Sequence, residues 1–434
     1  MKKKLFALSI LLAGFTALPT VYAASPCGVA DLTQCPTPID EKIPDVKDML
    51  KWDINDRVIG FRNDYRAYPG DVFKHATPRP LLRQIVDMSG ASYTIDNHTY
   101  NLQEYIARNK VSGLLVVKNG VIVTEFYGRG NTPQTLWTSR SVGKSIVSTL
   151  VGVALKEGKI KSLDDKVVEY NPDVKDTVWA NVTIRQLLQH TSGVNWSENY
   201  EIENSDFAKL TACEATEKAY PCVHDLVINK TRKADAKPGT LWSYSSGGAW
   251  LLGDTLEKAV GMPIAQYLQE KIWQPYGMVN DGVWHSYEVG KHDVGAHGFN
   301  ATLEDWGKIG QFLLDNGSLP NGKTILPSQW VADARHWNQA KNSVSEKHPE
   351  GTYGYEWWNN SVPANAHNVE PKEGLSQADT MWALGIFGQM IVVNQKENLV
   401  FVQWSTWEKA EPSFSAEPLE ASLMFNAIAN KLRK

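Results

Sequence analysis

One serine and one lysine stand three residues apart at the start of a predicted helix. Ser141 and Lys144 belong to a segment that runs from a turn into an apolar, helix-forming stretch. Residues at this spacing share one face of a helix, so the lysine amine can reach the serine hydroxyl. A serine nucleophile without a histidine base requires such a neighbour to take its proton. The pair therefore predicts acyl transfer through a covalent serine ester.

Two other interpretations of this segment are open. Ser141 could be a helix N-cap, with Lys144 solvated one turn later. Gly143-Lys144-Ser145 looks like the end of a phosphate-binding loop, but that loop needs a glycine where this chain has Thr138. The chain has no second serine-x-x-lysine. Nucleotide binding is therefore disfavoured, while the capping interpretation depends on what surrounds the pair.

A serine hydrolase that uses lysine as its base also needs a second proton carrier. Tyr244 is the candidate, because it lies on a turn after Pro238 and Gly239 and before a predicted helix. Ser246, two residues further on, could stand beside the phenol in a cleft. Taken alone, Tyr244 would be a core tyrosine that precedes a helix. Its combination with the serine and lysine motif favours a site.

Three segments, 141–144, 183–194 and 238–246, occur in this order along the chain. Together they resemble the serine β-lactamase and DD-peptidase superfamily, in its class C-like branch. Within that superfamily the chain looks most like the 6-aminohexanoate-dimer hydrolases and their esterase relatives. The residues that carry this closer resemblance are 191–200, 205–206, 354–358 and 385–389.

The resemblance implies a fold and a mechanism. The fold class is α/β plus all-α: a class C β-lactamase-like antiparallel sheet flanked by helices, with an inserted helical domain. Ser141 would be the nucleophile, Lys144 the base and Tyr244 the proton carrier. The reaction would be hydrolysis of a small-molecule ester or amide through an acyl-enzyme, with no cofactor and no metal.

The resemblance also implies which residues surround the substrate. The backbone N–H groups of Ser141 and Ile386 would hold the oxyanion. Ser246 would bind substrate, and the loop residue Tyr200 would assist at the leaving amide nitrogen. Two alternatives remain open: a DD-peptidase or weak β-lactamase, and a non-catalytic binding or sensor protein of the same fold.

The chain departs from the β-lactamases at one element. Where they carry lysine-threonine-glycine, it reads Gly385-Ile386-Phe387-Gly388, with no cation. Four tryptophans lie close in sequence to motif residues: Trp137, Trp196, Trp242 and Trp382. We therefore expect an aromatic, cation-poor cleft that prefers acyl groups without a carboxylate beside the scissile bond.

The histidines are expected to be structural. His190 lies in one of the resembling segments, where it would buttress a loop. His292 and His297, with Asp293, fit no regular metal-ligand spacing. The chain shows no glycine-x-serine-x-glycine elbow for a serine–histidine–aspartate triad.

The N-terminus predicts export. Lys2, Lys3 and Lys4 precede an apolar run and a small-residue cleavage site at Ala23, which is typical of a signal peptide over residues 1–23. We expect a periplasmic or extracellular protein. The apolar run is too short to remain as an anchor, and no later stretch predicts stable membrane insertion. The net charge of −4 gives no basic footprint for nucleic acid, and the sequence leaves the oligomeric state open.

Four cysteines follow the signal peptide: Cys27, Cys35, Cys213 and Cys222. An even number in an exported chain indicates disulfides. Two local pairs, Cys27 with Cys35 and Cys213 with Cys222, are the most economical of three possible connectivities.

Strand patterns flank a helical middle. Asn119-Gly120 between two β-branched runs predicts a hairpin, and strands are expected again over 387–393 and 399–403. Helical patterns dominate from 141 to about 340, and a closing helix is expected over 419–432. We expect an extended N-terminal segment over 24–85, a sheet domain made of 86–140 and 375–434, and a mainly helical domain over 141–374. This arrangement would place Ser141 at the junction of the two domains.

Overall fold

The structure is a computed structural model that describes residues 41–234, 236–335, 353–359, 379–411 and 417–433. The expected signal peptide and the expected pairing of Cys27 with Cys35 lie outside the described residues. Within the described ranges, no helix has both the length and the apolar character needed to cross a membrane.

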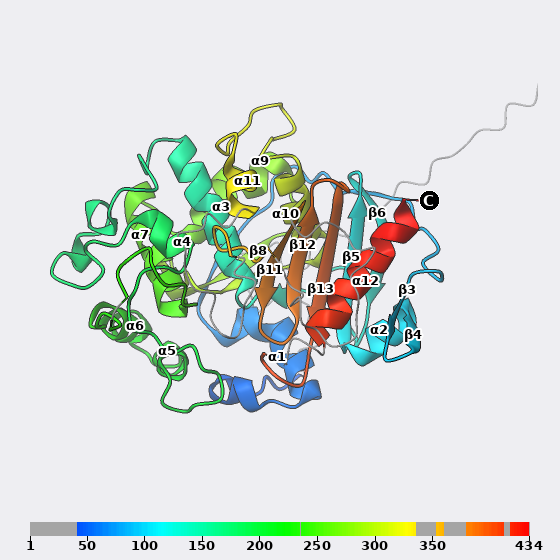
Figure 1. The fold of residues 1–434 in the computed structure, drawn as a ribbon, viewed down its shortest axis with the longest axis horizontal. Coiled ribbons are helices and arrows are strands. Elements are labelled where there is room, and N and C mark those ends of the chain that lie inside the picture. The colour runs from blue at the N-terminus through cyan, green and yellow to red at the C-terminus, as the bar shows by residue number, and fades with distance from the viewer. Residues whose placement is uncertain (1–40, 235, 336–352, 360–378, 412–416, 434) are drawn as a thin grey trace, which may run out of the picture.

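A six-stranded sheet joins strands from both ends of the chain (Figure 1). Its strands, in sheet order, are β11 Thr380–Gly385, β12 Gln389–Asn394, β13 Leu399–Ser405, β5 Val111–Lys118, β6 Val121–Tyr127 and β2 Leu82–Arg83. All neighbours are antiparallel except β2 and β6. Leu399 pairs with Lys118, so the hairpin around Asn119 lies directly beside the C-terminal strands. The predicted sheet between the two ends of the chain is therefore confirmed.

Both faces of this sheet are buried. In β5, Leu115 and Val117 belong to one core cluster, while Leu114 and Val116 belong to another. This follows from the two-residue period of a strand. Helix α10 (Leu303–Leu314) packs on the first face. Helix α12 (Glu417–Leu432) crosses the second face in Figure 1 and contributes Phe425 to the cluster there.

A second sheet takes three of its five strands from the region 141–374, which was expected to be mainly helical. Its strands, in sheet order, are β1 Gly70–Phe73, β8 Gly282–Glu288, β10 Phe299–Ala301 and β7 Trp137–Thr138, with β9 His292–Asp293 beside β8. Strands β8 and β10 are almost entirely buried and lack alternation, which is why their pattern did not indicate strands. Their importance for the site is that β7 leads directly into Ser141.

The N-terminal segment also departs from the expected extended chain. Residues Ile54–Ala67 form helix α1, which Asp53 caps by accepting a hydrogen bond from the Asp56 N–H. Phe61 and Tyr65, four residues apart, are buried on one face of this helix. Charged residues between them hide this pattern in the sequence.

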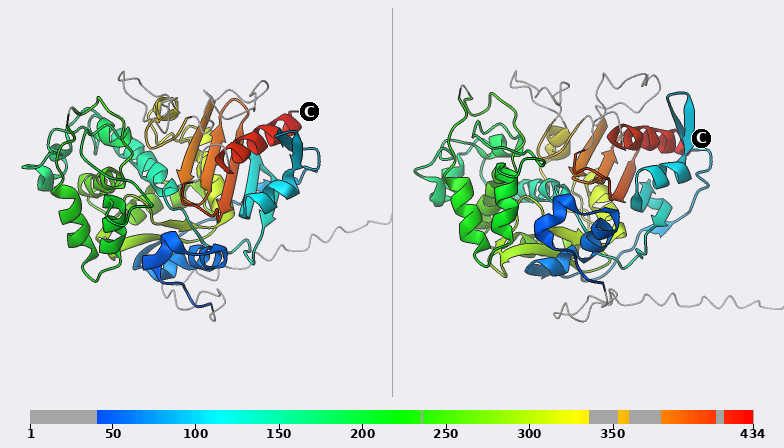
Figure 2. Two further views of the ribbon diagram at one scale, coloured as in Figure 1. Left: turned by 60° about the horizontal axis from the view of Figure 1, so that its bottom comes forward. Right: turned by 90° about the horizontal axis from the view of Figure 1, so that it is seen from below.

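Helix α3 (Val142–Lys156) is the central element and is buried all round from Val142 to Ala154. Figures 1 and 2 show it between the six-stranded sheet and a group of helices that lies beside that sheet. The other helices are α2 Leu102–Arg108, α4 Ile184–Leu188, α5 Asp206–Glu214, α6 Ala219–Ile228, α7 Ser246–Val260, α8 Ile264–Leu268, α9 Gln274–Tyr276 and α11 Trp330–Arg335. Short helical turns cover Val46–Lys51, Val167–Glu169, Pro172–Val174 and Gln269–Trp273, and β3 Ser92–Ile95 pairs with β4 His98–Asn101.

Candidate active site

Ser141 and Lys144 meet at the N-terminus of α3. Lys144 Nζ donates one hydrogen bond to Ser141 Oγ and another to the carbonyl of Ala296, both at 2.8 Å. Lys144 is only 2% exposed, so it is not the solvated lysine of the capping interpretation. The Ser141 side chain likewise makes no N-cap hydrogen bond. A hydroxyl and a buried amine are therefore held together.

The surroundings of Lys144 favour the neutral amine. Burial lowers its pKa, because the charged form loses its hydration. The negative charges of Glu198, Glu356 and Glu214 act in the opposite direction and offset part of this effect. None of the three carboxylates bonds directly to Nζ among the described residues. The amine can thus exist unprotonated at a lower pH than an ordinary lysine.

The turn before Ser141 has an unusual backbone. Arg140 has a positive φ of 46°, a conformation that side chains other than glycine and asparagine seldom adopt. Its buried guanidinium donates to Asp64 Oδ1 at 3.1 Å and lies over the ring of Phe61. His285 Nε2 lies 3.1 Å from the other oxygen of Asp64. This buried ion network holds the turn that presents Ser141.

Tyr244 lies on the other side of the pair. Its ring centroid is 5.2 Å from Lys144 Nζ. Burial, followed by the charges of Glu198 and Glu356, raises the pKa of Tyr244 well above its ordinary value, and a hydrogen bond with Ser141 offsets part of the increase. A phenol with a raised pKa keeps its proton. The structure thus brings the three predicted catalytic side chains into one group.

Aromatic rings fix the orientation of Tyr244. His190 packs on it at 4.6 Å and Trp358 stacks at 5.7 Å between ring centroids. His190 Nδ1 accepts a hydrogen bond from the Ser245 N–H, so its proton is on Nε2, which faces Glu356 at 2.8 Å. Both ring nitrogens of His190 therefore have partners, and the ring supports Tyr244.

A cavity of about 490 Å³ opens at Ser141. Tyr200, Tyr244 and Ile386 contribute to its walls, as predicted for substrate-contacting positions. Aromatic residues make up much of the remaining wall: Trp196, Trp242, Trp358, Trp382 and Trp407. The charged lining residues among those described are Glu198, Lys233 and Glu411. The cavity is therefore aromatic and large enough for a small molecule.

Three details differ from the expected cleft. Trp137 does not line the cavity. It stacks on Trp404 of β13 at 5.4 Å between ring centroids, and its indole N–H donates to Gln389. Its strand, β7, also contacts helix α1, so the side chain lies in the core. Ser246 also lies behind the wall, where its hydroxyl donates to Glu198 at 2.6 Å. Lys233 places one cation at the cavity, although the element around Ile386 contains none.

The backbone at Ile386 approaches the turn before Ser141. A side chain at Gly385 would meet the carbonyl oxygen of Ser139 at 2.6 Å, so only glycine allows this contact. Among the described residues, the backbone N–H groups of Ser141 and Ile386 have no hydrogen-bond acceptor. Two unsatisfied donors thus belong to residues that line the same cavity.

Sequence reasoning missed the acidic groups behind the site. Glu198 accepts hydrogen bonds from four groups. Glu356 lies 2.8 Å from His190 Nε2 and accepts a hydrogen bond from the Tyr353 hydroxyl at 2.6 Å. Glu214 lies 3.1 Å from His297 Nε2 and accepts from the Tyr287 hydroxyl at 2.9 Å. The position of Glu198 inside the segment 191–200 was the one signal that could have identified it.

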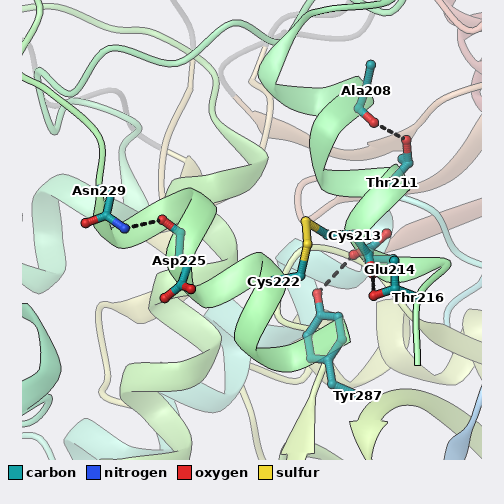
Figure 3. Close-up of a disulfide and its surroundings, with 9 residues drawn as sticks. All are labelled: Ala208, Thr211, Cys213, Glu214, Thr216, Cys222, Asp225, Asn229 and Tyr287. Carbon is teal, nitrogen blue, oxygen red and sulfur yellow. Dashed lines mark hydrogen bonds between the residues drawn. A yellow bond between two sulfur atoms is a disulfide. The ribbon is translucent and has the colours of Figure 1, made fainter. Parts of the chain in front are cut away.

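A disulfide links Cys213 at the end of α5 to Cys222 in α6, as predicted, with 5.4 Å between their Cα atoms. Figure 3 shows Glu214 directly beside it, bonded to Tyr287. The cross-link holds together the two helices next to this carboxylate. It therefore helps to fix the position of Glu214, whose negative charge raises the pKa of Lys144.

One acidic cluster lies away from the cavity. Ligand atoms of Asp254, Glu257 and His292 lie within 4.8 Å of one another. Lys258 Nζ and the Tyr220 hydroxyl both donate to Asp254. An ammonium thus already supplies positive charge at this cluster.

Comparison with known proteins adds to this geometry. The Beta-lactamase family model matches residues 99–423. The 6-aminohexanoate-dimer hydrolase of Paenarthrobacter ureafaciens is 22% identical over 316 residues, which is 71% of this chain and 75% of that protein. Esterase EstB of Burkholderia gladioli is 32% identical over 163 residues, or 36% of this chain and 40% of that protein.

Solved structures show the same architecture. A Bacillus anthracis structure named "Putative 6-aminohexanoate-dimer hydrolase" has a TM-score of 0.74 at 22% identity and covers 90% of this chain and 99% of its own. A class C beta-lactamase variant has a TM-score of 0.50 at 17% identity, with 76% of this chain and 95% of that chain covered. These likenesses confirm the predicted fold.

Proposed function

We propose that this chain, which belongs to the beta-lactamase family, is a serine hydrolase that cleaves ester or amide bonds through an acyl-enzyme on Ser141. One observation carries the proposal: a buried lysine amine whose only side-chain hydrogen-bond partner among the described residues is the Ser141 hydroxyl, 2.8 Å away. A lysine without a carboxylate partner in a buried site is suited to act as a base.

The proposed acylation begins with proton transfer from Ser141 Oγ to Lys144 Nζ. The serine oxygen then bonds to the substrate carbonyl carbon, and the carbonyl oxygen takes the negative charge. When the tetrahedral intermediate collapses, the carbon–oxygen or carbon–nitrogen bond to the leaving group breaks. The leaving group takes a proton from Tyr244, which recovers it from Lys144. Water then attacks the acyl-enzyme by the same route and releases the acid.

The oxyanion would be held by the backbone N–H groups of Ser141 and Ile386. The lack of an acceptor for either group within the described residues supports this role, because both donors stay available to a substrate oxygen in the cavity that their residues line. The close contact of Gly385 with Ser139 brings the two segments together.

We propose a neutral or weakly charged small molecule with an apolar acyl chain as the substrate. The aromatic walls of the cavity support this choice. The similarity to a 6-aminohexanoate-dimer hydrolase and to an esterase supports amides and esters as the two chemical classes to test. We further propose that the chain is exported by its N-terminal segment and acts in the periplasm or outside the cell.

The test is turnover of a substrate panel by the wild type and by Ser141→Ala. The panel contains short p-nitrophenyl esters, the linear 6-aminohexanoate dimer and nitrocefin. We expect turnover of an ester or amide that the Ser141→Ala variant loses. Intact-mass spectrometry during turnover should show an acyl adduct on the peptide that contains Ser141. Stoichiometric labelling without turnover would instead support the binding or sensor alternative.

A further inference from the structure

Lys233 is the positively charged residue among the described ones that line the cavity of Ser141. It is half-buried, and its backbone N–H donates to the carbonyl of Gly193 at 2.9 Å, which anchors the main chain there. Within the described ranges, its Nζ makes no hydrogen bond, no ion pair and no contact over an aromatic ring. The ammonium is therefore available to a molecule in the cavity.

The two cations that precede Lys233 are used inside the fold. Lys230 forms an ion pair with Asp206. Arg232 donates hydrogen bonds to two backbone carbonyls. Of these three neighbouring cations, Lys233 is thus the one that the described part of the protein leaves without a partner.

The carboxylate of Glu198 lines the same cavity, but it makes no ion pair with Lys233, and both residues lie in the described part of the chain. It accepts four hydrogen bonds, from Trp196, Tyr200 and Ser246. A carboxylate has about four lone-pair sites, so these donors use its acceptor capacity. Glu198 therefore leaves the charge of Lys233 to another anion.

The sequence around Lys233 is basic, although the chain as a whole is acidic. Residues 229–237 carry four cations and one acid, within a chain of net charge −4. Among the described residues, Arg232 and the exposed Lys237 have no carboxylate partner. Their charges add to that of Lys233 and attract anions to this side of the cavity.

Lys233 belongs to the helical side of the site. It lies between α6 and α7, whereas Ile386 follows β11 of the six-stranded sheet. Figure 1 shows α6 and α7 in the group of helices and β11 in the sheet. Within the described ranges, Lys233 also makes no hydrogen bond or ring contact with Lys144 or Tyr244. A group that it binds is therefore held from a different wall than the one where the β-lactamases carry their lysine.

We propose that Lys233 is a specificity-determining residue, which binds a carboxylate that the substrate carries apart from its scissile bond. A single ammonium balances one negative charge, so one carboxylate fits this site better than a dianionic phosphate. The aromatic walls would take the apolar chain between the carboxylate and the scissile ester or amide. This proposal rests on the proposed function, because it concerns the substrate of the same cavity.

The experiment compares substrates that differ only in one charge. The first pair is the mono-p-nitrophenyl ester of adipic acid and the same ester of adipic acid monoamide, because a carboxylate and a carboxamide have the same shape. It is repeated with the longer suberic acid. The second pair carries the charge on the leaving side: the hexanoate esters of 4-hydroxyphenylacetic acid and of 4-hydroxyphenylacetamide. The readout for each pair is the ratio of kcat/KM for the acid to that for the amide, after subtraction of the Ser141→Ala background.

We expect Lys233→Gln to lower at least one of these ratios by about tenfold, which is the effect of one charge-assisted hydrogen bond. Lys233→Arg keeps the charge and should retain most of the ratio, whereas Lys233→Glu should lower it further than Lys233→Gln. Higher ionic strength should also lower the wild-type ratio, because salt screens an ion pair with a half-exposed lysine. The ratio of Lys233→Gln should respond little to salt.

Lys237→Gln is the matched control, because it removes an exposed lysine of the same segment that does not line the cavity. It should leave every ratio close to the wild-type value. Thermal unfolding of each variant checks the fold. If neither Lys233→Gln nor Lys233→Glu folds, the salt dependence of the wild-type ratio decides the outcome.

Unchanged ratios in Lys233→Gln, or equal losses on acid and amide, would overturn the proposal. So would an equal effect of Lys237→Gln, which would show a general attraction by the basic segment and not a site at Lys233. Failure of the proposed function looks different: no substrate would then be turned over faster by the wild type than by Ser141→Ala.

Discussion

Two buried cations flank Ser141, and the protein surrounds them in opposite ways. Arg140 precedes the serine and is paired with Asp64, whose second oxygen lies against His285. Lys144 follows the serine by one turn and contacts a hydroxyl and a carbonyl, with no carboxylate in direct contact among the described residues. The charge of Arg140 is thus balanced by a carboxylate in direct contact, whereas Lys144 has no carboxylate in direct contact among the described residues.

This difference gives the two side chains different roles: Arg140 stabilises the structure, and Lys144 can take part in the chemistry. Burial raises the pKa of Asp64, but the charges of Arg140 and His285 lower it well below its usual range, so the pair stays ionised. Burial without such a partner lowers the pKa of Lys144. An arginine could not replace that lysine, since a guanidinium does not lose its proton in a protein. The paired cation holds the turn, and the unpaired one can exchange a proton.

The largest effect on activity is expected when the side chain of Ser141 or of Lys144 is removed. Ser141→Ala and Lys144→Ala should each lower kcat/KM by about 10³-fold or more, and the double variant should be no worse than either single variant. Lys144→Arg should be equally inactive, because it restores the charge but not the base. Steady-state kinetics on the best substrate checks this. Near-wild-type activity in Ser141→Ala would show that Ser141 is not the nucleophile. Near-wild-type activity in Lys144→Arg would show that Lys144 does not act as the base.

The paired cation should affect stability first. Asp64→Asn leaves Arg140 buried without a counter-charge and should reduce the free energy of unfolding by about 3–5 kcal/mol. Urea unfolding followed by tryptophan fluorescence measures this. Asp176→Asn, at an exposed position, should change it by less than about 0.5 kcal/mol. Equal stabilities of the two variants would show that Arg140 needs no partner.

Neither Arg140 nor Lys144 lines the cavity, so neither is placed to bind a substrate carboxylate there, and this predicts selectivity among substrates. Lys233 is the cation among the described lining residues, and the element around Ile386 has none. A lost charge-assisted contact to a carboxylate costs about 1.5–3 kcal/mol. We therefore expect kcat/KM for a short p-nitrophenyl ester to exceed that for nitrocefin by more than about tenfold, after subtraction of the Ser141→Ala background. Equal or faster nitrocefin turnover would favour a β-lactamase or DD-peptidase.

The smallest expected effect is a displacement of the pH profile. Lys144 must be neutral to act as a base, so kcat/KM should rise with pH through the pKa of this amine. The charge of Glu214 raises that pKa. Glu214→Gln should lower it and move the rising limb of the profile to lower pH. Glu217→Gln, at an exposed position nearby, should leave the limb in place. A displacement to higher pH would contradict this account of Lys144.

The sequence alone was sufficient wherever the relevant contacts lie within a few residues of one another. The spacing of Ser141 and Lys144 predicted their contact, because a helix brings residues three apart onto one face. Asn119-Gly120 predicted a hairpin, and the cysteines at 213 and 222 predicted a local disulfide. The strand patterns near both ends also predicted a shared sheet, since each could bury its faces only against the other.

The tertiary structure decided what surrounds these residues. Nothing in the sequence indicated that Arg140 would be paired with Asp64, 76 positions away, while Lys144 would not be paired. The short strands β8 and β10 went unrecognised because strands buried on all sides lose their alternation. Trp137 was expected in the cavity but lies in the core. Periodicity and spacing describe one element at a time, whereas the pKa of a buried amine depends on every charge that the packed fold brings near it.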